Sequence, residues 1–357
     1  PRMLEQTSQV MGNREVDLHP CIHDLSAEAS MCGLREMVCI VSGASRGIGQ
    51  GIAVRFGKSG ARVSVLGRSE GTVSWGPGTL SDVVLQINTV GGEGLAVPCD
   101  LSRPAQISDA IEKVVDKFGR IDVLVNNASA HYTLGIESLD EKRFDLLNHL
   151  NVRGTFLLTR SAIPHMRASA LPHVLTVAPV PIADRTWIGL TTCYSTSKIA
   201  MGMFTAAWSL EFPSIHFNAL WPQWPVATFA VTNTFQADIG KAVTVAAMAD
   251  PAYRIVTSES RGQFYKDAGV LMGMGITDMS AWKVDPSTHE LLEGIMVEPD
   301  GLKAGQRVEY ISPPRISTPC SIMDKAMLLV GANESTAAIH AMVQSANAYA
   351  TTCELTG

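Results

Sequence analysis

Residues 194–198 read Tyr-Ser-Thr-Ser-Lys and place a phenol and an ammonium group four positions apart. On a helix this spacing puts both side chains on one face, about one turn from each other. Free tyrosine titrates near pH ~10, which is too high for ready acid–base chemistry at neutral pH. A neighbouring positive charge favours the phenolate and lowers the pKa. Tyr194 and Lys198 are therefore a candidate proton-transfer pair, although a solvated helix face also carries this spacing without any function.

A glycine-rich turn lies near the start of the region with regular patterns. Residues 37–41 form a short apolar run, typical of a buried parallel strand. Residues 42–49 then read Ser-Gly-Ala-Ser-Arg-Gly-Ile-Gly, and a helical pattern over 48–58 follows. Such glycines let a pyrophosphate approach the backbone, where the helix N-terminus offers amide groups and a positive dipole end. The sequence predicts a nucleotide site here; a tight turn without a ligand is the alternative.

The second expected strand, 61–66, ends in Gly67 and Arg68. Dinucleotide folds that prefer NAD usually place an acidic residue here, which accepts a hydrogen bond from the ribose 2′-hydroxyl. This chain has no acid at that point. Arg68 and Arg46 would instead suit a 2′-phosphate, so the sequence favours NADP over NAD. Two ordinary surface arginines are the alternative.

Strands and helices continue to alternate along the chain. Further strands are expected at 94–99, 121–125, 173–177 and 215–220, and further helices at 81–90, 104–118, 139–167 and 194–212. This alternation indicates βαβ units, hence an α/β fold with a Rossmann-type, doubly wound parallel sheet and helices on both faces. The motifs all fall at or just beyond the carboxyl ends of strands, where such sheets bind ligands.

Further polar residues follow in order: Asp100 after the third strand, Asn-Asn-Ala at 126–128, and Asn151 in Asn-Val-Arg-Gly. With the glycine turn and the Tyr194–Lys198 pair, they make the chain resemble the short-chain dehydrogenase/reductase family over residues 36–283. Within that family it is most similar to the hydroxysteroid dehydrogenase-like branch. The resemblance implies an oxidoreductase that transfers hydride between NADP(H) and a small carbonyl compound or secondary alcohol.

The resemblance also implies a role for each matching residue. Tyr194 would exchange a proton with the substrate oxygen, Lys198 would hold the nicotinamide ribose and lower the tyrosine pKa, and Asn151 would support a relay water. The implied cofactor contacts are Gly43, Ser45, Arg46, Gly47, Ile48, Gly49, Arg68, Asp100, Leu101, Asn127, Ala128, Tyr194, Lys198 and Thr228.

The chain departs from the family pattern where a serine is expected near the end of the fifth strand. Pro181 stands thirteen residues before Tyr194 and Ala178 sixteen before it, and neither has a hydroxyl. Loss of one such donor commonly costs ~3 kcal/mol, or roughly a hundred- to a thousandfold in rate. Two functions remain: a slow enzyme assisted by Thr176 or Thr191, or a weakened or inactive member that serves as an accessory or scaffold subunit of a larger assembly.

A second departure lies after the sixth strand. Residues 221–225 read Trp-Pro-Gln-Trp-Pro, with Gln223 where the family usually has glycine. We expect these bulky side chains to narrow or reshape the substrate pocket.

Composition limits the class of protein. The 357 residues are 46% hydrophobic, and the mean hydropathy is +0.14, which supplies ample core for an α/β fold. A net charge of −6 gives no electrostatic case for binding nucleic acid, and no apolar run reaches the ~18 residues of a membrane span. Seven scattered cysteines indicate reduced thiols in an intracellular protein; the cytoplasm is favoured, with mitochondria and peroxisomes as alternatives. His19, Cys21 and His23 lack a fourth ligand nearby, so no metal site is expected.

Both ends of the chain fall outside the family likeness. Residues 1–35 carry acidic side chains that transit peptides avoid, so no import signal is expected. Residues 284–357 contain two helical patterns, at 321–330 and 334–350, and read as a tail that wraps the core or docks on another chain. The resemblance further implies a homo-oligomer formed through the helices at 139–167 and 194–212.

Overall fold

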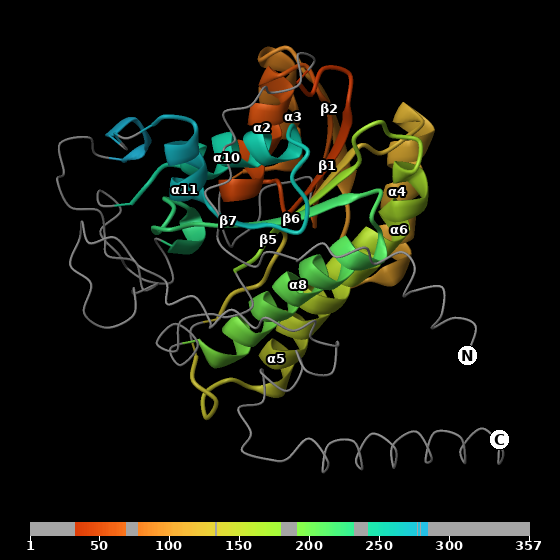
Figure 1. Cartoon of the computed structure of the whole chain (residues 1–357). Coiled ribbons are helices and arrows are strands. Elements are labelled where there is room, and N and C mark those ends of the chain that lie inside the picture. The colour runs from red at the N-terminus through yellow and green to blue at the C-terminus, as the bar shows by residue number, and fades with distance from the viewer. Residues whose placement is uncertain are drawn as a thin grey trace, which may run out of the picture. The chain divides into compact units, whose positions relative to one another are not determined.

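The computed structural model describes residues 33–68, 78–132, 134–179, 191–231, 242–276, 278 and 280–284. These residues all belong to the first of two compact units, Pro1–Gly301 and Leu302–Gly357. Their strands form one seven-stranded sheet in the order β3-β2-β1-β4-β5-β6-β7 (Figure 1). The strands are β1 (Val38–Ser42), β2 (Arg62–Gly67), β3 (Glu93–Pro98), β4 (Val123–Asn126), β5 (His173–Val177), β6 (His216–Trp221) and β7 (Phe264–Lys266). Every neighbouring pair is parallel.

Helices cover both faces of the sheet, as expected for a doubly wound fold. They are α2 (Gly47–Lys58), α3 (Leu80–Thr89), α4 (Pro104–Phe118), α5 (Glu141–Leu147), α6 (Thr155–Met166), α8 (Thr192–Glu211), α10 (Ala246–Val256) and α11 (Asp267–Gly273). Helices α2, α3 and α10 pack on one face, and α4, α6 and α8 on the other (Figure 1). The predicted Rossmann-type architecture is confirmed.

Strand β1 shows how the sequence pattern builds these layers. All five of its residues are buried, as expected for a central strand with helices on both sides. Because successive side chains point to opposite faces, Cys39 and Val41 join one apolar cluster while Val38 and Ile40 join the other. The continuous apolar run at the start of the domain therefore supplies both halves of the core.

The expected helix at 139–167 is divided in the structure. A π-helical segment, Asn148–Gly154, separates α5 from α6. The wider turn carries the buried Asn151, whose side chain makes three hydrogen bonds outside this helix. Strand β7 and helices α10 and α11 were not predicted. The expected helices at 321–330 and 334–350, the group at residues 19–23, and Pro181 lie outside the described residues.

The carboxyl ends of β1 and β4 meet at the point where the strand order reverses, because β1 pairs with β2 on one side and β4 on the other. This switch point is where open α/β sheets bind ligands. None of the helices in the described part of the chain is both long and apolar enough to cross a bilayer.

Candidate active site

The turn between β1 and α2 needs glycine for its backbone and for its packing. Gly43 has a φ of +65° and Gly47 a φ of +58°, in the left-handed region. A Cβ on Gly43 would lie 2.7 Å from the Cα of Ala128, and one on Gly49 would lie 2.5 Å from Nδ2 of Asn127. The predicted glycines therefore hold the turn tightly against the segment that follows β4.

The first turn of α2 is suited to an anion. Its N-cap is Arg46, which has no acceptor for the backbone amides, and it contains no acidic residue. The amide groups and the positive dipole end are therefore available to a phosphate. A Cβ on Gly47 would lie 3.3 Å from Cγ2 of Thr228, so Thr228 stands beside the turn. Ser45 lies next to the end of β2, and Ile48 packs against the core. These residues fit the pyrophosphate of a dinucleotide.

Ser42 and Asn127 join the ends of β1 and β4. The Asn127 amide donates from Nδ2 to the carbonyl oxygens of Ser42 and Gly43, at 2.9 and 3.2 Å. Ser42 Oγ accepts from the backbone N–H groups of Asn127 and Ala128, at 3.0 and 3.1 Å. Sequence reasoning missed Ser42, although a hydroxyl in the last position of the strand was a visible signal. These hydrogen bonds hold the carboxyl ends of β1 and β4 together beneath the site.

Two arginines meet near the ends of β1 and β2. Partial burial and the positive charge of Arg68 both lower the pKa of Arg46 from its ordinary value. The guanidinium group of Arg46 therefore lies within the electrostatic influence of Arg68.

Asp100 and Leu101 follow β3 at the same edge of the sheet. The Asp100 carboxylate accepts from Ser102, from its backbone N–H at 2.9 Å and its hydroxyl at 2.7 Å. Leu101 is buried, and its carbonyl oxygen lies 3.0 Å from where a Cβ on Gly154 would stand. Leu101 therefore lies between β3 and the π-helical segment, and Asp100 lies at the end of β3.

Lys198 lies at the end of β5. It is fully buried, and its Nζ donates to the carbonyl oxygen of Val177 at 2.6 Å. The Nζ atom is also 5.5 Å from the centre of the Trp221 ring. Burial lowers the pKa of Lys198 to about 7, because the charged form is disfavoured away from water.

Tyr194 is half-buried, one turn before Lys198 on α8. Burial raises its pKa, and a side-chain hydrogen bond from Ser129 partly opposes that shift. This differs from the expected depression by the neighbouring ammonium. The reason is desolvation, which disfavours the phenolate and the ammonium alike.

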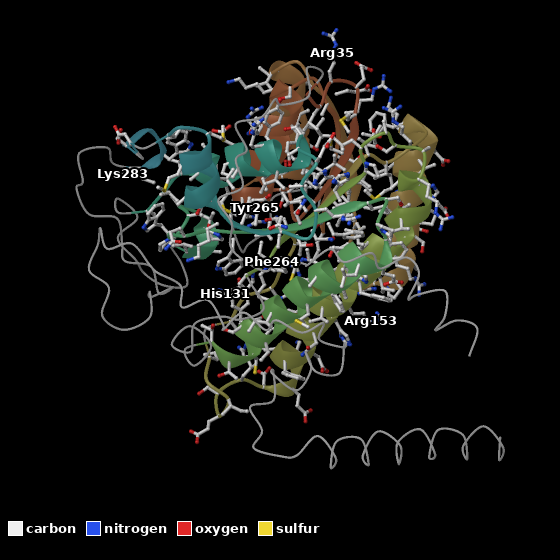
Figure 2. All side chains as sticks on the ribbon, in the orientation of Figure 1. Arg35, His131, Arg153, Phe264, Tyr265 and Lys283 are labelled. Atoms are coloured by element: carbon white, nitrogen blue, oxygen red, sulfur yellow. The ribbon has the colours of Figure 1, made fainter. Side chains whose placement is uncertain are left out.

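Ser129 and His131 bring a second group of side chains to Tyr194. The His131 ring meets the Tyr194 ring edge-on, with centroids 4.4 Å apart and planes at 86°. Burial and the nearby Lys198 lower the pKa of His131 to about 4, so its imidazole is neutral at pH 7. In Figure 2, His131 and Arg35 lie toward opposite ends of the strands, since Arg35 precedes β1 and His131 follows β4. The sequence analysis gave no catalytic or cofactor-binding role to Ser129 or His131.

Asn151 connects this loop to α8. Its Oδ1 accepts from the backbone N–H of Ala130 at 2.7 Å, and its Nδ2 donates to the Ala130 carbonyl at 3.1 Å. The same Nδ2 donates to Ser197 Oγ at 2.9 Å, and Ser197 in turn donates to the Tyr194 carbonyl at 2.7 Å. The predicted Asn151, Tyr194 and Lys198 therefore gather at one place.

Thr176 and Thr191, the two expected substitutes for the missing serine, have hydroxyl groups in other environments. Ala178 is buried and offers only a methyl group. Thr176 is fully buried, and its Oγ1 finds no partner among the described residues. Thr191 Oγ1 lies 2.7 Å from Ser195 Oγ, within the start of α8.

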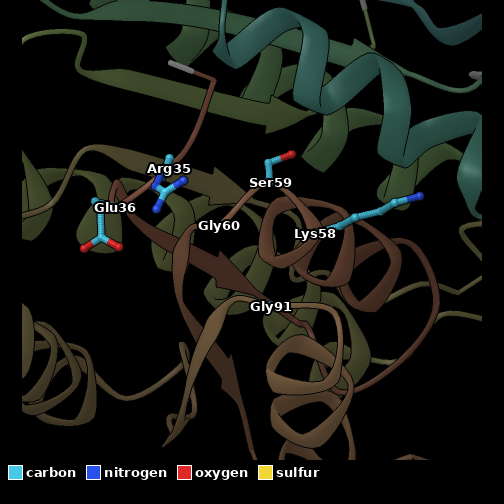
Figure 3. Close-up of a pocket in the computed structure, with 6 residues that line it drawn as sticks. All are labelled: Arg35, Glu36, Lys58, Ser59, Gly60 and Gly91. Atoms are coloured by element: carbon cyan, nitrogen blue, oxygen red, sulfur yellow. The ribbon is translucent and has the colours of Figure 1, made fainter. Parts of the chain in front are cut away.

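A cavity of about 420 Å³ opens at the other edge of the sheet (Figure 3). It is lined by Arg35, Glu36, Lys58, Ser59, Gly60 and Gly91. These residues precede β1, β2 and β3, so the cavity is separated from the glycine turn by the length of the strands. Among the residues that the structure describes, no group of three or more His, Cys, Asp or Glu side chains could hold a metal ion.

The fold and the site define a Rossmann-type α/β protein with a glycine turn and a tyrosine–lysine pair at the carboxyl ends of its strands. A family model described as "short chain dehydrogenase" matches residues 37–238. Hydroxysteroid dehydrogenase-like protein 2 of Danio rerio is 36% identical over 262 residues, which cover 72% of this chain and 63% of that protein. The human protein of the same name is 33% identical, over 69% of this chain and 60% of its own length. The chain therefore belongs to the short-chain dehydrogenase family, as the motifs predicted, and spans less than two thirds of these relatives.

Solved structures agree with this assignment. A chain from Xanthomonas campestris is 38% identical with a TM-score of 0.69, covering 72% of this chain and 97% of that one. A metagenomic short-chain oxidoreductase in complex with NADP is 25% identical, with a TM-score of 0.54, covering 66% and 98%. An NADH-dependent reductase of alginate metabolism is 26% identical, with a TM-score of 0.56, covering 66% and 96%. Both nicotinamide cofactors thus occur among the structural neighbours.

Proposed function

We propose that this protein is an NADP(H)-dependent oxidoreductase that interconverts a small carbonyl compound and a secondary alcohol. The observation that carries the proposal is the position of Tyr194 and Lys198. Both stand on α8 at the carboxyl end of β5, on the same edge of the sheet as the glycine turn. The cofactor, when bound, supplies or accepts the hydride.

The pKa values of Tyr194 and Lys198 support a role for each in proton transfer. The raised pKa of Tyr194 keeps its phenol protonated at neutral pH, ready to act as an acid. As hydride adds to the carbonyl carbon, the phenol proton passes to the carbonyl oxygen and yields the alcohol. Lys198, with a pKa of about 7, stabilises the resulting phenolate when it carries its positive charge.

The preference for NADP rests on the two arginines. Arg46 and Arg68 lie near each other, and β2 ends without an acidic residue. Guanidinium groups bind phosphate oxygens well, whereas an acid would favour the ribose 2′-hydroxyl of NAD.

A second function is favoured by the methyl group of Ala178, which stands where a hydroxyl was expected. In that case the protein is a weakened or inactive family member that serves as an accessory or scaffold subunit.

Thermal unfolding with NADPH, with NADH and with neither separates these functions. A ligand that binds only the folded state raises the melting temperature. We expect the larger rise with NADPH, retention of that rise in a Tyr194→Phe variant, and loss of benzil reduction in the same variant. Binding without reduction of benzil or cyclohexanone would support the accessory function. No rise with either cofactor would contradict the proposed enzyme.

A further inference from the structure

We infer that the hydroxyl of Ser129 hydrogen bonds to the substrate oxygen beside Tyr194 and so does the work of the hydroxyl that Ala178 lacks. The inference rests on the proposed function and names a further residue that acts on the reacting atoms.

The first support is the position of Ser129 beside Tyr194, the proposed proton donor. His131, two residues further along the same loop, meets the Tyr194 ring with centroids 4.4 Å apart, and a side-chain hydrogen bond from Ser129 acts to lower the pKa of Tyr194. Ser129 is exposed and Tyr194 is half-buried, so this pair lies where the protein surface meets the site. An oxygen that approaches the Tyr194 phenol from this side comes within reach of Ser129.

The second support is the rigidity of the loop that carries Ser129. Its next residue, Ala130, is held through both its N–H and its carbonyl by the side chain of Asn151. The residue after that, His131, packs edge-on against the Tyr194 ring. Ser129 is therefore held in place relative to Tyr194, because the two residues that follow it are both fixed by contacts. A preorganised donor is more effective than a mobile one.

The third support is the environment of the competing hydroxyl groups. Thr176 is fully buried, and Thr191 Oγ1 lies 2.7 Å from Ser195 Oγ. Ser129, by contrast, is a hydrogen-bond partner of the Tyr194 side chain.

A bound nicotinamide cofactor would supply hydride to the carbonyl carbon, while the Tyr194 phenol would give its proton to the carbonyl oxygen. Ser129 donates a hydrogen bond to the same oxygen and keeps its proton. A hydroxyl has one donor and two acceptor positions, so Ser129 can turn its hydrogen from Tyr194 to the substrate. Solvent then returns a proton to Tyr194.

A double-mutant cycle in thermal unfolding tests the contact without substrate or cofactor. The variants are Ser129→Ala, Tyr194→Phe and the double variant. If the hydroxyl groups are hydrogen bonded, the two shifts in melting temperature will be non-additive, because the second substitution removes a bond that is already lost. Additive shifts would overturn the inference, whether or not the protein proves to be an enzyme.

Turnover tests the role. With NADPH and benzil, Ser129→Ala should lower kcat by about a hundredfold while the melting-temperature rise with NADPH is kept. Adding Ala178→Ser to Ser129→Ala should restore part of kcat.

The matched control is Thr196→Val, which removes an exposed hydroxyl from α8 that donates to the Cys193 carbonyl, and it should leave kcat unchanged. Wild-type kcat in Ser129→Ala would overturn the inference while leaving the proposed function intact. An inactive wild-type protein that binds no cofactor would instead defeat the proposed function, and the catalytic role of Ser129 with it.

Discussion

Burial shifts the pKa values of three ionisable side chains at the site so that the neutral form of each is favoured. Burial raises the pKa of Tyr194, lowers that of Lys198 to about 7, and lowers that of His131 to about 4. The first and third are therefore neutral at pH 7, while Lys198 is divided between its two forms. A site with so little fixed charge responds strongly to a charged ligand, because the dielectric screening around it is weak.

Two substitutions of His131 distinguish a packing role of its ring from a chemical role of its nitrogens. Since its pKa is about 4, it should add no inflection to the pH profile of kcat between about pH 6 and 8. We expect His131→Phe to keep most of the activity, because a ring still packs on Tyr194. His131→Ala should lower kcat more, because the Tyr194 ring loses its support. Equal losses in both variants would point to a direct role for the imidazole nitrogens.

At the scale of elements, Asn151 is the clearest case of one side chain holding three segments. It is fully buried, and it ties the π-helical segment to Ala130 and to α8. Asn151→Ala leaves the Ala130 N–H and the Ser197 hydroxyl without this partner. We expect a loss of about 1–3 kcal/mol in the free energy of unfolding, measured with urea. Asn148→Ala, which removes an exposed side-chain bond to Phe144, is the matched control and should cost less.

Asp267 links α11 to the loop after β6. It is fully buried; its Oδ1 accepts from the backbone N–H groups of Gln223 at 2.6 Å and Ala268 at 2.8 Å, while Oδ2 has no partner among the described residues. Burial raises its pKa to about 7. The folded state therefore holds a proton that the unfolded state releases above its ordinary pKa of about 4.

The stability that Asp267 contributes should thus be largest in acid and fall as the pH rises from about 4 to 7, by at most about 1.4 kcal/mol per pH unit. Asp267→Asn keeps the accepting oxygen and removes the titration. Urea unfolding at several pH values should show a flatter profile for this variant than for the wild type. The control Asp116→Asn, at an exposed position on α4, should keep the wild-type slope; a wild-type slope in Asp267→Asn would contradict the prediction.

The sequence predicted most elements because their apolar periods are local. It predicted the glycine turn, Asn127 and the Tyr194–Lys198 pair because they recur at strand ends in a fixed order. It could not show the π-helical segment, which depends on bonds between Asn151 and distant residues. Strand β7 has only three residues, too few for a period. The contacts of Ser129 and His131 with Tyr194 depend on a loop path that no spacing encodes.

At the scale of the whole molecule, helices α6 and α8 carry exposed apolar side chains. Met203 and Leu210, seven residues apart on α8, are 51% and 61% exposed, and Phe156 on α6 is 37% exposed. The two helices lie side by side, with Phe156 6.2 Å from Phe204 between ring centroids (Figure 1). Such faces commonly mark an interface.

We therefore expect a homo-oligomer formed through this face, in line with the prediction from the sequence. Met203→Glu combined with Leu210→Glu should shift the protein toward the monomer, because each new charge would be buried in the interface. Light scattering after size-exclusion chromatography measures the change. Leu85→Glu, at an exposed leucine on α3, is the control and should not alter the mass. A monomeric wild-type protein would rule out this interface.

The two edge strands of the sheet affect how copies of the chain can meet. Strand β3 begins with Glu93, which faces Arg62 and Lys117 at 3.6 and 3.3 Å, and ends with Pro98, which has no N–H to donate. Strand β7 at the other edge is three residues long. Short, charged or proline-terminated edges are poor templates for a further strand. Fibre growth by sheet continuation should therefore require prior unfolding.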